Sequence, residues 1–289
     1  MVFFLLALSI VLSTGRNVLS KSLSDVRFGT RPFFLCQGLL FLSGGAALLL
    51  FGRVSFAETA TQALIYAAVY ALLLILAQWF YTAALSRGNT ALCSTVYSMG
   101  FILPTLSGAI LWGEALTVLD AFGVLCAVSA VIVSGLGGGQ RKGTGVTPYG
   151  FLALVIAMLA SGGLGIVQKL QQKSSCAEQK SLFLLTAFLI AALLSFLAWG
   201  CTKKQTAPSL PPRRWSSAVC VGLFFGCCNL LNTSLAGQLD SAIFFPTLNI
   251  GVILLSMLSG ILFFGERLRK KETVILLLGG ASILLLNFG

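Results

Sequence analysis

The stretch FILPTLSGAILWGEAL, residues 101–116, returns in the second half of the chain as VILLSMLSGILFFGERL, residues 252–268. A shift of 152 residues aligns the surrounding segment, residues 84–116, with its second copy without a gap. Leucine matches are common in so apolar a chain, so the Leu-Ser-Gly and Gly-Glu pairs carry most of the weight. The repeated stretch predicts that the two halves of the chain contain copies of one helical unit.

The composition excludes a soluble fold. Hydrophobic residues make up 57% of the 289 residues, charged residues only 9%, and the mean hydropathy is +0.96. A soluble globular chain carries about a quarter charged residues. The chain is therefore predicted to be an all-α integral membrane protein. Its net charge of +11 is best explained by basic connections on the cytoplasmic face, and nucleic acid is not expected as a partner.

Ten apolar runs are long enough to cross a bilayer, which takes about 20 residues of helix. We predict ten transmembrane helices over residues 2–20, 33–51, 62–85, 90–112, 117–136, 149–168, 181–200, 215–236, 241–264 and 273–288.

The predicted helices form two sets of five around a glycine-rich joint. Residues 1–137 form the first five-helix repeat, residues 138–148 the linker and residues 149–289 the second repeat. An odd number of crossings in each repeat places the second copy in the membrane with the opposite orientation. The sequence thus predicts an inverted repeat.

The repeated stretches, with the Ala-Leu-x-x-Gly segment at Ala84, Leu85 and Gly88, resemble the EamA-type members of the drug/metabolite transporter superfamily. The resemblance covers nearly the whole chain. It implies ten helices, with the first, third, fourth, sixth, eighth and ninth around a central cavity, and transport of a small metabolite. One departure is that Pro104 has Ser256 at the matched position, while Pro246 lies ten residues earlier. We therefore expect the two helices to kink differently.

The two Gly-Glu pairs, Gly113-Glu114 and Gly265-Glu266, mark the ends of repeated helices. Glycine suits the left-handed residue that ends a helix, and a carboxylate ahead of the next helix meets that helix's positive N-terminal end. We expect a structural role for both pairs.

Polar residues inside the apolar runs are the candidates for a substrate pathway, because lipid offers them no hydrogen-bond partner. Each either lines the pathway or bonds to a neighbouring helix. The candidates are Thr14, Arg16, Asn17, Gln78, Tyr81, Thr82, Ser94, Thr95, Tyr97, Ser98, Asn229, Asn232, Thr247 and Asn249.

Arg16 is the one strongly basic residue within a predicted span. A charge at the bilayer centre costs about 2.5 to 3.5 kcal/mol on insertion scales. Two interpretations remain open: Arg16 extends to the far membrane interface, or it pairs with an anionic group of a substrate.

These features favour a secondary transporter, as an exporter or exchanger, of a small organic metabolite such as an amino acid or derivative. It would work by alternating access in the plasma (inner) membrane, as a monomer or homodimer. The chain has no histidine and no GxxxxGK[ST] motif, so an enzyme and a resident metal or other cofactor are not expected. A non-transporting scaffold or a channel is the alternative.

The basic residues predict an orientation. Fourteen of the 19 lie in the connections that follow the odd-numbered predicted helices, and the positive-inside rule then places these connections in the cytoplasm and both termini outside. The family resemblance implies the opposite. We expect a reporter that is active only in the cytoplasm to be inactive when fused after Gly289, and an active fusion would contradict the charge rule.

Overall fold

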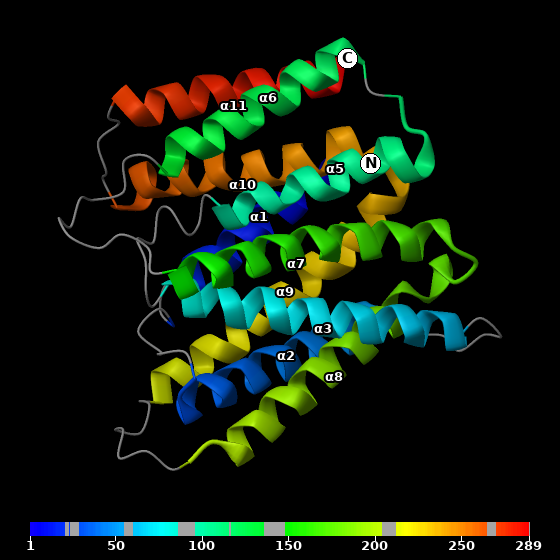
Figure 1. Cartoon of the computed structure of the whole chain (residues 1–289), viewed down its shortest axis with the longest axis vertical. Helices are drawn as coiled ribbons and strands as arrows, with labels where there is room; N and C mark the ends of the chain where they lie inside the picture. The colour runs from blue at the N-terminus through cyan, green and yellow to red at the C-terminus, as the bar shows by residue number, and fades with distance from the viewer. Residues whose placement is uncertain are drawn as a thin grey trace. The chain divides into compact units, whose positions relative to one another are not determined.

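The computed structural model describes residues 1–20, 23, 29–54, 60–85, 96–115, 117–135, 148–203, 212–264 and 270–288. These residues are helical or lie in short turns, and none of them is in a strand (Figure 1). The helices are α1 (Val2–Ser20), α2 (Arg31–Phe51), α3 (Ala60–Leu85), η2 (Met99–Phe101), α5 (Ile102–Trp112), α6 (Val118–Gly135), α7 (Pro148–Lys173), η3 (Ala177–Gln179), α8 (Lys180–Cys201), α9 (Pro212–Gln238), α10 (Ser241–Phe264) and α11 (Lys270–Phe288).

Within this described part, six helices are long and apolar enough to cross a membrane: α1, α2, α3, α7, α8 and α9. Four further apolar stretches, in and around α5, α6, α10 and α11, are shorter. The predicted all-helical class is present, and the long apolar helices fit a multi-pass membrane protein.

Most predicted boundaries agree with the observed helix ends to within three residues. At the fourth predicted helix, residues 90–112, α5 itself begins only at Ile102, after the 3₁₀ turn Met99–Phe101. Among the other helices the largest difference is in α7, which continues to Lys173 instead of ending at residue 168. No proline or glycine interrupts residues 169–173, so a boundary drawn at the first charged residue stops the helix too early. Residues 90–95 of the fourth predicted helix lie outside the described residues.

The chain packs into two compact units. Unit 1 contains Met1–Ile75 and Val167–Gly237, and unit 2 contains Leu76–Ile166 and Gln238–Gly289. Each unit therefore combines segments from both halves of the sequence. The helices α3 and α7 contribute residues to both units, whereas the sequence repeats follow the order of the chain.

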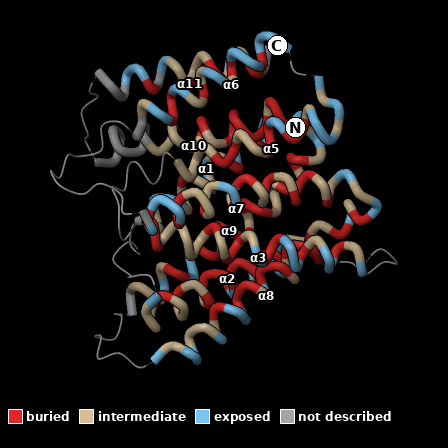
Figure 2. Tube along the Cα trace, in the orientation of Figure 1, coloured by how far each residue is buried: buried red, intermediate tan, exposed pale blue. Residues whose placement is uncertain are grey.

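In unit 1, α2 and α8 lie side by side (Figure 1) because small residues let the two helices approach closely. A Cβ atom added to Gly38 would lie 2.6 Å from Cε1 of Phe196, and one added to Gly44 would overlap Phe188. Buried residues concentrate where α2 and α8 face each other (Figure 2). Small residues at helix crossings are the usual way to pack helices where lipid gives no hydrophobic driving force.

In unit 2, α6 packs along α11 and α5 packs along α10. The Ser282 hydroxyl on α11 donates a hydrogen bond of 2.8 Å to the Gly123 carbonyl on α6. A Cβ atom on Gly123 would lie 2.7 Å from Cγ of Leu286. Glycine at this position therefore lets the serine reach the backbone of the neighbouring helix.

The first Gly-Glu pair ends α5 as a structural motif. Gly113 has φ of 62° and ψ of 27°, the left-handed conformation expected from its place after the helix. The carboxylate of Glu114 accepts a hydrogen bond of 2.7 Å from the backbone N–H of Ser241, the first residue of α10. It thus satisfies the N-terminus of α10, and the expectation that it meets the next helix along the chain is wrong.

The next helix, α6, has its own capping residues, which explains the difference. Thr117 N–H donates to Asp120 Oδ2 at 2.9 Å, and Asp120 N–H donates to the Thr117 hydroxyl at 3.1 Å. This reciprocal pair is a capping box. Asp120 caps the start of α6, and Glu114 accepts its hydrogen bond from the N-terminus of α10. Gly265 and Glu266 lie outside the described residues.

The two prolines occupy different positions in their helices. Pro104 follows the 3₁₀ turn Met99–Phe101 in the first turn of α5. Because proline has no N–H, the helix cannot bond regularly to Gly100 at this point. Pro246 lies inside α10, which continues as one helix from Ser241 to Phe264.

We predict that Gly108→Ala destabilises the protein by about 1 to 3 kcal/mol, because the added methyl group would meet Glu114 and lie 2.5 Å from Ser241 Cβ. The matched control is Gly280→Ala on α11, where an added Cβ atom meets no described atom within 4 Å. The measurement is the midpoint of thermal unfolding in detergent. Equal midpoints for the two variants would contradict the packing of α5 on α10.

Candidate functional site

Three buried polar side chains from three helices meet in unit 1. Tyr70 on α3 donates its hydroxyl proton to Asn229 Oδ1 on α9 at 2.5 Å. Gln168 on α7 donates from Nε2 to the Tyr70 hydroxyl oxygen at 2.8 Å and to Asn229 Oδ1 at 3.2 Å. Asn229 also donates from Nδ2 to the Phe225 carbonyl at 2.8 Å. We call Tyr70, Gln168 and Asn229 the amide–tyrosine cluster.

A second polar contact line joins α1 to α9 in the same unit. The Ser9 hydroxyl donates to Asn232 Oδ1, Ser13 lies beside Cys228, and the Arg16 guanidinium lies 4.3 Å from the centre of the Phe225 ring. Residue numbers rise along α1 as they fall along α9, so the helices run antiparallel along this line. We call these six residues the α1–α9 seam.

Aromatic rings support both groups. Phe225 lies edge-on to Phe188 with ring centres 5.3 Å apart, and Phe188 lies edge-on to Phe41 at 6.1 Å. Tyr70 packs against Phe183 at 5.1 Å. Edge-to-face pairs at these distances are favourable and fix the rings in orientation. The polar groups of unit 1 therefore lie beside a set of aromatic rings that contact one another.

Asn229 and Asn232, three residues apart on α9, were predicted to share a face. Both lie on the side of α9 that packs within unit 1, but they serve different partners: Asn229 bonds to α3 and α7, and Asn232 bonds to α1. Thr14 is buried and bonds to the Ile10 carbonyl of its own helix. Asn17, another candidate on α1, is exposed.

The remaining described candidates belong to unit 2. Tyr81 and Tyr97 pack ring against ring with centres 4.4 Å apart, and the Thr82 hydroxyl donates to the Gln78 carbonyl. Asn249 donates to the Phe245 carbonyl at 2.9 Å. The buried Thr247 hydroxyl has no hydrogen-bond partner in the described part of the chain. Ser94 and Thr95 lie outside the described residues.

Sequence reasoning missed six of the nine residues in the cluster and the seam: Ser9, Ser13, Tyr70, Gln168, Phe225 and Cys228. It also placed Lys169 just after the predicted span 149–168, but Lys169 lies within α7 and is only 1% exposed. A buried cation is costly in a membrane helix and marks a functional position. The signal was available in the run QKLQQK, residues 168–173, which contains no helix-breaking residue.

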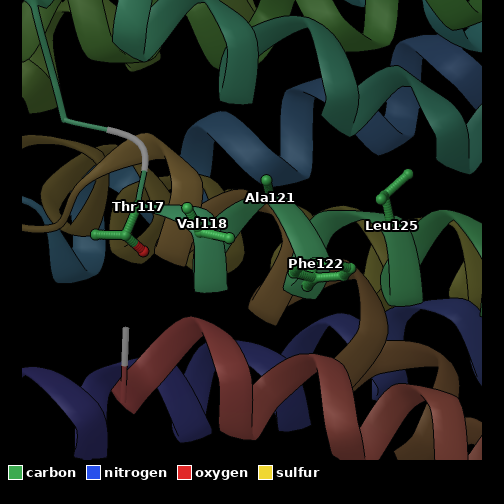
Figure 3. Close-up of a pocket in the computed structure, with 5 residues that line it drawn as sticks. All are labelled: Thr117, Val118, Ala121, Phe122 and Leu125. Carbon is green, nitrogen blue, oxygen red and sulfur yellow. The ribbon is translucent and has the colours of Figure 1, made fainter.

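A hollow of about 260 Å³ lies along the start of α6, lined by Thr117, Val118, Ala121, Phe122 and Leu125 (Figure 3). Of its lining residues, Val118 is 72% exposed and Leu125 60% exposed. An exposed apolar surface of this kind suits contact with lipid tails. It offers one hydroxyl group to a polar ligand, so the polar side chains of unit 1 are the better candidate site.

Comparison with known proteins gives a fold and no family. No family model and no curated protein matches the chain. A solved structure described only as "Crystal structure of protein" is similar over 97% of this chain and 94% of its own, with a TM-score of 0.75 and 19% sequence identity. At this identity the similarity shows a shared fold.

We predict that Tyr70→Phe destabilises the protein by about 1 to 3 kcal/mol, because the loss of the hydroxyl removes two hydrogen bonds inside the amide–tyrosine cluster. Tyr66→Phe, one turn earlier on α3 and half-buried, is the matched control and should change stability by less than about 0.5 kcal/mol. Thermal unfolding of the purified variants compares the two. If both variants unfold at the parental temperature, the cluster does not hold the helices together.

Proposed function

We propose that the chain is a secondary transporter of a small organic metabolite such as an amino acid or derivative, and that it acts as an exporter or exchanger in the plasma membrane. Ten transmembrane helices in two inverted five-helix repeats would provide alternating access. The proposal combines the sequence repeat and the family resemblance with the polar groups of unit 1.

The observation that carries the proposal is the amide–tyrosine cluster. Tyr70, Gln168 and Asn229 are buried in helices that are otherwise apolar, and buried polar networks in membrane proteins mark substrate or ion pathways. No hydrogen bond in the described part of the chain reaches Gln168 Oε1 or Asn232 Nδ2. A polar solute could therefore donate to Gln168 Oε1 in the cluster and accept from Asn232 Nδ2 in the seam.

Counterflow in proteoliposomes tests this function. Vesicles loaded with an unlabelled metabolite are supplied with the same labelled metabolite, over a panel of amino acids, purines and sugars. A carrier accumulates label transiently above equilibrium, a channel only equilibrates it, and a scaffold does neither. Asn229→Leu should lower counterflow at least about tenfold, because it leaves Tyr70 and Gln168 without their shared acceptor. Thr61→Leu, at an exposed position on α3, is the matched control.

We further predict that transport does not depend on an imposed pH gradient. Carboxylate-based drug/proton antiport needs an acidic side chain at which a proton and a cation compete. Glu114 and Asp120 are instead used at the N-termini of α10 and α6. Glu114→Gln keeps an acceptor for Ser241 N–H and should therefore transport like the parent. Gradient-driven accumulation of ethidium that Glu114→Gln abolishes would show that this carboxylate is a proton-coupling group.

A further inference from the structure

We propose that Arg16, held on the face of Phe225, binds an oxyanion, and that this oxyanion is the carboxylate of the transported metabolite. The inference deepens the proposed function. It rests on that function only for the identification of the ligand as the transported metabolite. Nothing in the resemblance or in the fold comparison assigns Arg16 a role.

Arg16 lies with its guanidinium carbon over the Phe225 ring. The guanidinium carbon lies 4.3 Å from the centre of the Phe225 ring. The Phe225 ring also packs against Phe188, with the two ring centres 5.3 Å apart. Stacking on an aromatic ring uses the flat face of a guanidinium and leaves its N–H groups at the edge free to donate. The ring contact therefore places the cation before any ligand arrives.

Within the described residues, nothing uses those N–H groups. In the described part of the chain, no hydrogen bond and no carboxylate within ion-pair distance reaches the Arg16 guanidinium. Arginine cannot lose its proton at any physiological pH. A fixed charge in an apolar helix, with up to five unused donors, therefore favours an anion as its ligand.

The geometry suits a planar oxyanion. A guanidinium edge gives two parallel N–H groups, which match the two oxygen atoms of a carboxylate. Arg16 is half-buried. Along the α1–α9 seam, Asn232 lies seven residues from Phe225, or about 10 Å at 1.5 Å per residue. A metabolite with its carboxylate at Arg16 could extend toward the amide of Asn232.

A lipid headgroup phosphate offers the same oxyanion chemistry, so the experiment separates the two sources. The purified full-length chain is placed in nanodiscs of phosphatidylcholine, and separately of phosphatidylglycerol. Thermal stabilisation is titrated with L-amino acids and short monocarboxylic acids, each beside its methyl ester. We expect at least one acid to stabilise the protein in both lipids and its ester to bind at least about tenfold more weakly.

The variants assign that binding to Arg16. Arg16→Gln should weaken binding of the acid at least about tenfold and leave binding of the ester unchanged, while Arg16→Lys should retain part of the preference because it keeps the charge. Phe225→Leu keeps the charge and removes the stack, so it should weaken binding by a smaller factor. Arg53→Gln, at an exposed arginine after α2, is the matched control and should behave like the parent.

Four outcomes overturn the inference. The acid and the ester bind equally, or Arg16→Gln keeps the acid preference, or no acid in the panel stabilises the chain. An effect of Arg16→Gln that appears only as a change in lipid dependence assigns Arg16 to headgroup phosphate and also overturns it. Because binding is measured without transport, acid binding at Arg16 in a chain that gives no counterflow would refute the proposed function and the transported origin of the ligand, and would leave standing only the assignment of carboxylate binding to Arg16.

Discussion

The structure depends on one constraint: inside a bilayer, a polar group that finds no partner within the protein is energetically costly. The backbone meets this constraint by forming helices throughout the described segments. Serine and threonine side chains meet it locally, as Thr14 and Ser195 do by bonding to the carbonyl four residues earlier. Amide and phenol groups have more bonds to make and must reach other helices. The amide–tyrosine cluster joins three helices for this reason.

The same constraint separates structural polar groups from available ones. Ser282 bonds to the Gly123 carbonyl on α6, and Glu114 bonds to the Ser241 N–H on α10. These bonds join neighbouring helices within unit 2. Gln168 and Asn232 make some bonds within unit 1 and keep others unused. Arg16 makes a ring contact and no hydrogen bond in the described part. Groups held in place but not fully bonded are the ones that a solute can bind, which is why unit 1 is the candidate site.

Tight helix contacts make such positioning possible. Glycines at the crossings of α2 with α8, of α5 with α10 and of α6 with α11 bring backbones close enough for a side chain to touch the next helix. Gly108 is the clearest case, since it makes room for both Glu114 and Ser241. The repeated Leu-Ser-Gly pattern is thus explained, for its first copy, by packing. Large apolar side chains elsewhere on these helices can face lipid without cost.

The sequence alone determined the helical class, because long apolar runs have few alternatives in a membrane, and it located most helix ends, because charges and turn residues mark them. It also predicted the left-handed end at Gly113, a property of one residue and its neighbours. Only the tertiary structure decided which polar residues meet. Tyr70, Gln168 and Asn229 are far apart in the chain, and hydropathy contains no information about partners. The target of Glu114 is α10 rather than α6 for the same reason: a hydrogen bond between distant helices is set by how they pack, and residue order does not encode that locally.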